Sequence, residues 1–224
     1  MTFSIVARCS RTGMFGVAVS SSSPAVAARC AYAQAGVGAV ASQNVTDPTL
    51  GTQALDLMAR GASAAEAVAI LKRTGAHMEY RQLLTVDGAG ISAIHSGPKA
   101  LGIWAEACDE NVACGGNLLA NEGVPQAMVD AFLASEGHLG DRIIATMRAA
   151  LKAGGEAGPV HSAGMRLVRE VAWPVADLRC DWTEECPIEE LAKLWDIYKP
   201  QLDAYVTRAI NPSDAPSYGV PGDE

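Results

Sequence analysis

The second residue of the chain is the one whose position most directly suggests chemistry. Thr2 follows Met1 and opens a short apolar segment, residues 3–7. Methionine removal acts when residue 2 is small, so we expect processing to expose Thr2 as the chain terminus. A terminal threonine combines a nucleophilic hydroxyl with an α-amino group of pKa about 8, which can accept the hydroxyl proton. Thr2 is therefore the first candidate catalytic residue.

Two further polar residues stand close to predicted strands and could act on the same reaction. Asn117 follows Gly115 and Gly116 after a short strand, where its amide could stabilise an oxyanion or could satisfy a turn. His161 precedes a strand near residues 165–168, where its imidazole could transfer a proton, anchor a carboxylate or cap loop backbone groups. We take both as candidate catalytic residues.

Hydroxyl and amide side chains near other strand ends are candidates for binding substrate. We predict this role for the following five residues: Ser20, Ser21, Gln43, Asn44 and Ser162.

The usual cofactor and metal motifs are not supported. Residues 36–41 match a loose glycine pattern for dinucleotides, but Ser42 follows and no helix begins before Pro48. The four histidines lack the i,i+4 spacing of a metal site. The six cysteines show no zinc spacing, and free thiols explain them better than a redox pair or a metal. We expect no cofactor and no metal.

Composition excludes some partners. The 224 residues carry a net charge of −8, which argues against nucleic-acid binding. No segment reads as a membrane span, and the N-terminus lacks a secretory signal pattern, so we expect a cytoplasmic protein that acts on a small molecule. Only 5% of the residues are aromatic, which predicts a core of small side chains.

The order of expected elements indicates layered α+β architecture. Strands over 3–7, 15–19 and 36–42 lack clean polar alternation, which is typical of a sheet covered on both faces. Helices over 48–60 and 63–74 follow, then strands around 83–94 and 103–115, helices over 125–135 and 139–153, and late strands around 165–180. Runs of like elements favour α+β over a strictly alternating parallel sheet.

The C-terminal segment forms a unit of its own in the sequence. Apolar residues from Ile188 to Ala209 recur at spacings of three and four, which predicts a helix that Pro200 kinks. We divide the chain into a main domain, residues 1–182, and a C-terminal helix with its tail, residues 183–224. The helix packs either on its own domain or on a partner subunit, and we expect a homo-oligomer.

Several segments resemble an uncharacterised bacterial family, described as a domain of unknown function within the N-terminal-nucleophile (Ntn) hydrolase superfamily. They are residues 2–8, 16–19, 35–40 and 116–120, with Pro48 and Gly51. The resemblance implies a four-layer αββα sandwich and hydrolysis of an amide bond by Thr2. In many relatives an Arg-x-Gln-Ser-Ala-like stretch stands where this chain has residues 159–163, so His161 replaces a polar amide. Cys9 stands where an acidic residue is commoner.

Three functional hypotheses follow. The first is a cofactor-independent hydrolase of a small amide or amino-acid derivative that uses Thr2. The second is a metabolite-binding protein on the same fold without catalysis, which a retained Met1 would favour. The third is an enzyme whose site consists of side chains alone, such as His161, Asn117 and a hydroxyl from residues 20–23.

Overall fold

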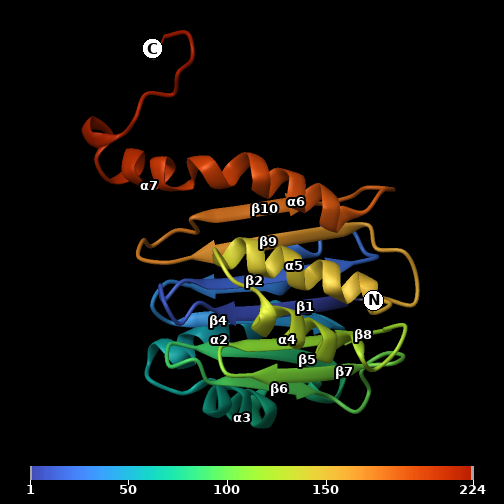
Figure 1. Ribbon diagram of the computed structural model, residues 1–224. Helices are drawn as coiled ribbons and strands as arrows, with labels where there is room; N and C mark the ends of the chain where they lie inside the picture. The colour runs from blue at the N-terminus through green and yellow to red at the C-terminus, as the bar shows by residue number, and fades with distance from the viewer. Residues whose placement is uncertain (1, 223–224) are drawn as a thin grey trace.

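Two antiparallel β-sheets form the centre of the computed structural model, which describes residues 2–222 (Figure 1). Sheet A has the strand order β10-β9-β2-β1-β8-β7 and sheet B the order β3-β4-β5-β6. The strands of sheet A are β1 (Thr2–Arg8), β2 (Phe15–Ser21), β7 (Ala105–Asp109), β8 (Val112–Asn117), β9 (Ser162–Val168) and β10 (Ala176–Cys180). Those of sheet B are β3 (Ala31–Gln34), β4 (Gly38–Asn44), β5 (Arg81–Asp87) and β6 (Ser92–Ser96).

Helices cover the outer face of each sheet. Sheet A packs against α4 (Val124–Ala134), α5 (Leu139–Lys152) and α6 (Pro187–Tyr198), and sheet B against α2 (Thr49–Ala59) and α3 (Ala64–Thr74). A short helix, α1 (Ala27–Cys30), joins the two sheets, and α7 (Leu202–Ile210) ends the helical part of the chain. The structure is therefore of the α+β class, as expected. None of the helices within residues 2–222 has the length and apolar character needed to cross a bilayer.

Strand β1 lies between β2 and β8 and has both faces covered. Phe3 and Ile5 pack toward the helices of sheet A, whereas Val6 packs between the two sheets. Because side chains alternate along a strand, Thr2 and Ser4 also point toward sheet B. The hydroxyl of Ser4 donates a hydrogen bond to the side-chain oxygen of Gln43 in β4, which confirms this direction.

Small residues let the two sheets approach closely. Ala39 and Ala41 of β4 and Ala113 of β8 are fully buried between the sheets. A Cβ atom on Gly115 would lie 3.4 Å from the side chain of Leu84 in the other sheet, so little space remains for a larger residue. The aromatic-poor composition therefore matches the narrow space between the sheets.

The observed elements differ from the sequence expectations mainly at their ends. Strand β4 runs on to Asn44 and β5 begins at Arg81, so both strands include polar residues that the apolar pattern left outside. The four-residue elements α1 and β3 were not expected. Four residues are too few to show a helical or alternating period, so only their tertiary contacts fix these two elements.

The C-terminal helix packs against the helices of its own chain. Ile188, Leu191 and Trp195 are buried in the same apolar cluster as α4 and α5. Asp141 of α5 accepts a hydrogen bond from the indole of Trp195 (2.8 Å) and pairs with Lys199 (2.6 Å). The helix is interrupted at residues 199–201 by a 3₁₀ turn that contains Pro200, as the proline predicts.

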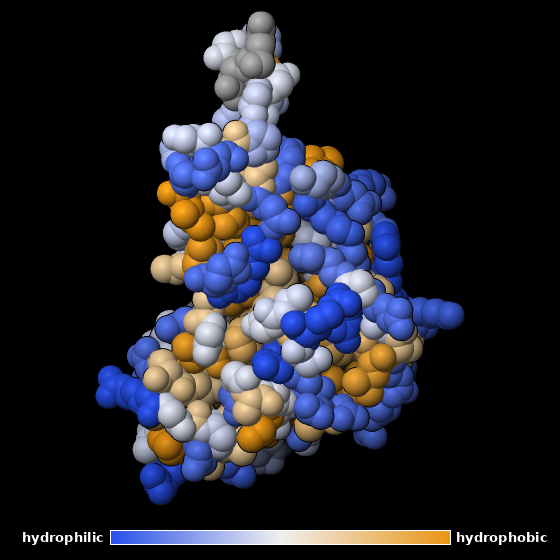
Figure 2. Space-filling view, turned by 60° about the vertical axis from the view of Figure 1, so that its left-hand side comes forward, coloured by the Kyte–Doolittle hydropathy of each residue, from blue (hydrophilic) through white to orange (hydrophobic). Residues whose placement is uncertain are grey.

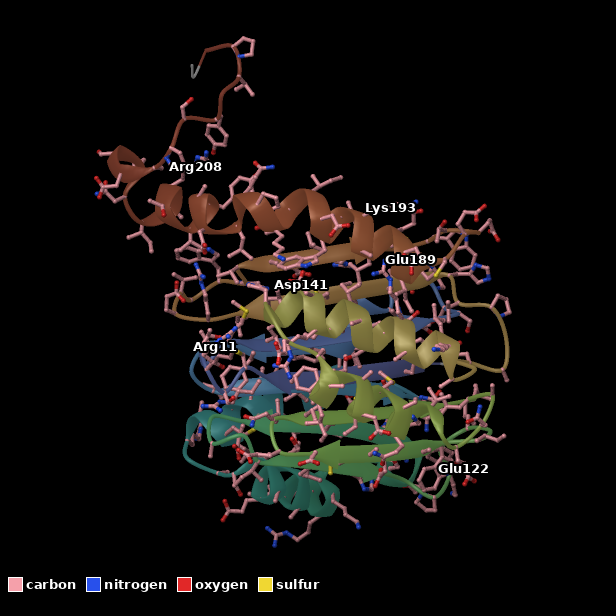
Figure 3. The ribbon with its side chains drawn as sticks, in the orientation of Figure 1. Arg11, Glu122, Asp141, Glu189, Lys193 and Arg208 are labelled. Atoms are coloured by element: carbon pink, nitrogen blue, oxygen red, sulfur yellow. The ribbon has the colours of Figure 1, made fainter. Side chains whose placement is uncertain are left out.

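Charged side chains hold this segment and the tail in place. Arg148 of α5 forms two hydrogen bonds with the Glu189 carboxylate of α6, at 2.8 and 2.6 Å. Arg208 lies 3.7 Å from the centre of the Tyr218 ring and donates to the carbonyl of Pro216. Figure 3 shows Asp141 beside the C-terminal helix, Glu189 on α6 and Arg208 near the end of α7.

The contact between α5 and α6 gives the first prediction, for Gly140→Ala. A Cβ atom at residue 140 would lie 2.4 Å from the Trp195 ring, too close for both to keep their places. Alanine normally stabilises a helix relative to glycine by about 0.5–1 kcal/mol. We expect the overlap to dominate and to lower the free energy of unfolding by ~1–3 kcal/mol, measured by chemical denaturation. In a Trp195→Leu background, Gly140→Ala should lower the free energy of unfolding by less. An equal loss in both backgrounds would contradict the contact.

Candidate functional site

Thr2 lies at the start of the central strand of sheet A. It pairs with Ser21, the last residue of β2, on one side and with Asn117, the last residue of β8, on the other. All three side chains point between the sheets, because they occupy paired positions. Only 7% of Thr2 and 1% of Asn117 is exposed. The structure therefore brings three of the predicted site residues together at one buried end of the sheets.

Amide side chains from both sheets close this end of the interior. The Gln82 side-chain oxygen accepts hydrogen bonds from Asn117 Nδ2 (3.3 Å) and Gln43 Nε2 (2.7 Å). Gln82 Nε2 in turn donates to Ser96 Oγ (2.9 Å) and to the carbonyl of Gly116 (3.2 Å). Since Gln43 and Gln82 are fully buried, these bonds offset the cost of removing their polar groups from water. They also fix the position of the Asn117 amide.

A chain of hydroxyl groups leads from Thr2 to a guanidinium. Thr2 Oγ1 lies 3.3 Å from Ser21 Oγ, and Ser21 Oγ lies 2.9 Å from Ser23 Oγ. Arg29 Nη2 donates to Ser23 Oγ at 2.7 Å, while its Nη1 donates to the carbonyls of Pro24 and Ala25. The positive charge thus lies at the far end of a hydrogen-bonded chain that begins at Thr2.

Three predicted binding residues lie outside this cluster. Ser20 points to the opposite face of β2 and donates to the carbonyl of Ser162. Ser162 donates to the carbonyl of Ser23 (2.6 Å) and accepts from the backbone N–H of Val26, so its hydroxyl holds the loop after β2. Asn44, in the left-handed conformation with φ 78°, donates to the carbonyl of Tyr80 and accepts from Leu101 N. Their hydroxyls and amide are thus used by backbone groups.

The His161 ring makes its described contacts away from Thr2. Its Nδ1 atom lies 2.9 Å from the carbonyl oxygen of Thr183, and the ring stacks on Trp182 with 4.4 Å between ring centres. His161 directly precedes β9, and β2 separates β9 from β1. Only its backbone N–H reaches the site strands, where it donates to the carbonyl of Ser21. A direct role for the ring in the Thr2 reaction has no support from these contacts.

A buried carboxyl group lies just beyond the start of β1. Glu156 forms a β-bridge with Leu119, and the neighbouring residues exchange backbone hydrogen bonds with residues 118 and 120. These residues continue β8 past Asn117, the partner of Thr2. The backbone N–H of Ser22, which follows the other partner of Thr2, also interacts with the Glu156 carboxyl group. Glu156 therefore lies between the extensions of the two strands that flank Thr2.

The surroundings of Glu156 favour its neutral form. The residue is 6% exposed, and no hydrogen bond of ordinary geometry reaches either carboxyl oxygen from residues 2–222. Burial raises the pKa of Glu156 to about 8, against the smaller opposing effects of the positive α-amino group of the chain and the Ser22 N–H. The carboxyl group is thus poised to gain or lose a proton near neutral pH.

Sequence reasoning missed both Gln82 and Glu156. Gln82 could have been found by pairing the two sheet-B strands, because it lies directly opposite Gln43 in their register. Glu156 follows Gly154 and Gly155, which we interpreted only as a helix end. A glutamate within the run of small residues 153–158 is a weak signal, and its burial depends on pairing with residues 118–120.

Metal binding has no support in the described part of the chain. Residues 2–222 contain no group of three His, Cys, Asp or Glu side chains placed to hold a metal ion. The six cysteines are free thiols in the structure.

The raised pKa of Glu156 predicts a pH-dependent stability. Between pH 4.5 and about 8 the unfolded chain ionises Glu156 while the folded chain keeps it protonated, so the folded state loses stability as pH rises. Glu156→Gln should remove this loss, which amounts to up to ~5 kcal/mol. We expect the variant to gain stability over the parent protein at pH 8.5 but not at pH 4, measured by denaturation at both pH values. The exposed Glu122→Gln should keep the parent's pH dependence, and an unchanged Glu156→Gln profile would contradict a buried neutral carboxyl.

Comparison with solved structures shows a relative with the same fold over most of its length. The crystal structure of protein SPO2555 from Silicibacter pomeroyi matches with a TM-score of 0.81 and 28% identity, covering 88% of each chain. Anbu (ancestral beta-subunit) from Yersinia bercovieri matches with a TM-score of 0.39 and 12% identity, over 91% of this chain and 97% of that one. Anbu from Hyphomicrobium sp. strain MC1 matches with a TM-score of 0.41 and 12% identity, over 92% and 99%.

The sequence comparison agrees with the first of these structures. Among curated proteins, none matches the chain significantly. Residues 2–191, well over half of the chain, match a family described as a family of unknown function, DUF1028, and the SPO2555 structure carries the same family designation. This chain therefore belongs to the DUF1028 family.

Proposed function

We propose that this protein is a cofactor-independent hydrolase of a small amide or amino-acid derivative, with Thr2 as its nucleophile once Met1 is removed. The observation that carries the proposal is the position of Thr2. It begins the central strand of sheet A, and its side chain lies among Ser21, Asn117 and the buried amides that hold them. A nucleophile needs this combination of a fixed position and nearby donors.

In the proposed reaction the α-amino group of processed Thr2 acts as the base. Thr2 Oγ1 attacks the carbonyl carbon of the amide while its proton passes to the neutral α-amine. The C–N bond then breaks, and the ammonium group returns the proton to the leaving nitrogen. An ester between Thr2 Oγ1 and the acyl group remains. Water attacks this ester with the α-amine again as base, which releases the acid and restores the hydroxyl.

Asn117 is the proposed donor to the oxyanion. Directly opposed residues in a sheet have Cβ atoms about 4.5–5.5 Å apart, so its amide is within reach of a carbonyl bound at Thr2. An asparagine amide has two N–H groups, and Nδ2 donates one bond to Gln82. We assign the other N–H to the oxyanion.

The hydroxyl chain to Arg29 helps Thr2 Oγ1 to give up its proton. If Ser23 donates to Ser21 and Ser21 to Thr2, the Thr2 proton is directed toward the amine, and the positive Arg29 polarises the chain. In this scheme Ser21 orients a polar group of the substrate. The Gln43 amide, which bonds to Gln82, Gly115 and Ser4, instead supports the site from behind, and Ser20, Asn44 and Ser162 hold the surrounding loops.

We also propose a four-layer fold, a domain division and a homo-oligomeric state for the chain. We assign the two facing sheets and their outer helices to the αββα sandwich of the Ntn hydrolases, with residues 1–182 as the main domain and 183–224 as an added C-terminal segment. Ile197 and Ile210 are 67% and 63% exposed on its helices, and Figure 2 shows apolar surface beneath the tail. This surface supports the proposed homo-oligomer. We also propose a cytoplasmic location.

A second candidate is a metabolite-binding protein without catalysis. The polar groups beside Thr2 favour it, because the Asn117 amide and the Ser21 hydroxyl would suit recognition of a small polar molecule. Retained Met1 would leave these groups in place but would remove the base. The remaining hypothesis, a site around His161, would have to connect the ring to Asn117 across two strands.

Two measurements test the hydrolase proposal. Intact-mass analysis of the protein from its native source should show loss of Met1. Thr2→Ala should then lower the hydrolysis of any substrate found in a panel of amino-acid amides and N-acyl amino acids by roughly 10³-fold or more, because the nucleophile is gone. Thr52→Ala, an exposed change of the same type on α2, is the matched control and should leave the rate unchanged. Retention of Met1 in most molecules, or full activity of Thr2→Ala, would overturn the proposal.

The role of Asn117 gives a separate prediction. Asn117→Asp keeps the shape of the side chain but replaces the N–H donor with an acceptor. We expect kcat to fall by roughly 10²-fold or more with little change in KM, since the lost bond forms mainly to the transition state. Steady-state kinetics on the substrate found above measures the effect. Asn211→Asp, in the exposed segment after α7 and far from the sheets, should behave like the parent enzyme, and a fall in that variant alone would contradict the assignment.

A further inference from the structure

Two of the described residues, Asp87 and Glu156, carry buried carboxyl groups that the reaction scheme above does not use, and Asp87 already accepts backbone hydrogen bonds. The Glu156 side chain is 6% exposed, and neither of its oxygens has a hydrogen-bond partner of ordinary geometry among residues 2–222. Leaving a buried polar group without a partner costs roughly 1–3 kcal/mol. A chain that keeps such a group in its interior gains from a ligand that satisfies it.

The position of Glu156 indicates which ligand that is. Residues 155–157 pair with residues 118–120, directly after the strand partner of Thr2. Ser22, whose N–H interacts with the carboxyl group, directly follows the other strand partner. A carboxyl group between these two extensions faces the place where the backbone nitrogen of Thr2 begins the strand. The ligand is therefore a cationic or hydrogen-bond-donating nitrogen at the start of β1.

We propose that Glu156 is the positioning residue for the α-amino group of processed Thr2, which it holds by a hydrogen bond and with which it shares one proton. This proposal rests on the proposed function, in which that amine is the base. Both Glu156 and the amine take part in the proton transfer of the reaction. When the shared proton lies on Glu156, the amine is neutral and takes the proton of Thr2 Oγ1. The carbonyl oxygen of the Glu156 carboxyl group accepts a hydrogen bond from the resulting ammonium. The ammonium then gives one proton to the nitrogen of the broken amide, and the pair again holds one shared proton.

The proton affinities of the two groups suit this exchange. The pKa of Glu156 is about 8, and an unperturbed α-amino group has a pKa of about 8 as well. A proton can pass between groups of equal pKa at little cost in free energy. An ordinary exposed glutamate would instead stay ionised near neutral pH and hold the amine in its protonated form, where it cannot act as a base. Burial of Glu156 therefore keeps the amine available.

The test uses the full chain released from a cleavable fusion so that Thr2 is its first residue, with ¹⁵N-labelled threonine. The α-amino resonance is followed by NMR from pH 5 to 11 in the parent protein and in Glu156→Gln. We expect the parent amine to titrate in two coupled steps, because it loses part of its proton when the pair goes from two protons to one and the rest when the pair loses its last proton. The second step should lie at least ~1 pH unit above the single step of the variant. Glu156→Asp keeps the carboxyl group and should keep the two steps, so it replaces Glu156→Gln if that variant does not fold.

Glu122→Gln provides the matched control. Glu122 is an exposed glutamate in the loop after β8, at the same end of the sheets, and Figure 3 shows it there. Its change should leave the titration as in the parent. Identical titrations in the parent and Glu156→Gln would overturn the proposal. The titration needs no substrate, so it tests the pairing of Glu156 with the amine separately from the hydrolase function. The pairing can be wrong while Thr2→Ala still abolishes hydrolysis, and it can be right even if no amide is hydrolysed.

Discussion

The pairing of β1 with β2 and β8 is the constraint on which the rest of the site depends. Because β1 is central in sheet A and covered on both faces, its first residue cannot move independently of the core. The register then places Ser21 and Asn117 beside Thr2 without any further contact being needed. A loop could offer the same side chains, but it would not hold them with the rigidity of six buried strand residues.

The polar groups between the sheets illustrate how burial determines both stability and chemistry. Gln43 and Gln82 are tolerated in the interior because each satisfies the other and a carbonyl of β8. Glu156 lacks such partners among the described residues and responds by retaining its proton. Burial at one end of the same two sheets thus has two results. Neutral amides gain a structural role, and the Glu156 carboxyl group has a pKa near 8.

The sequence was informative where a local pattern decides the outcome. The helix that begins at Ser63 has the predicted capping box with Glu66, and Pro200 interrupts the C-terminal helix as expected. Ser21, Gln43 and Asn117 could be chosen because each stands just beyond a predicted strand, and Thr2 because removal of Met1 would expose it. The partnership of Gln82 and the burial of Glu156 could not be chosen in this way. They depend on strand pairing between residues far apart in the chain, and no local period encodes that pairing.

The burial of Thr2 has a practical consequence for producing the protein. Any affinity tag placed before Thr2 would have to join the chain at a residue that is only 7% exposed, and it would convert the α-amino group of Thr2 into an amide. A tag on the other terminus meets no such obstacle, since the tail after α7 runs away from both sheets (Figure 1). Under the proposed mechanism, samples with an N-terminal tag would therefore be silent in activity screens even when fully folded.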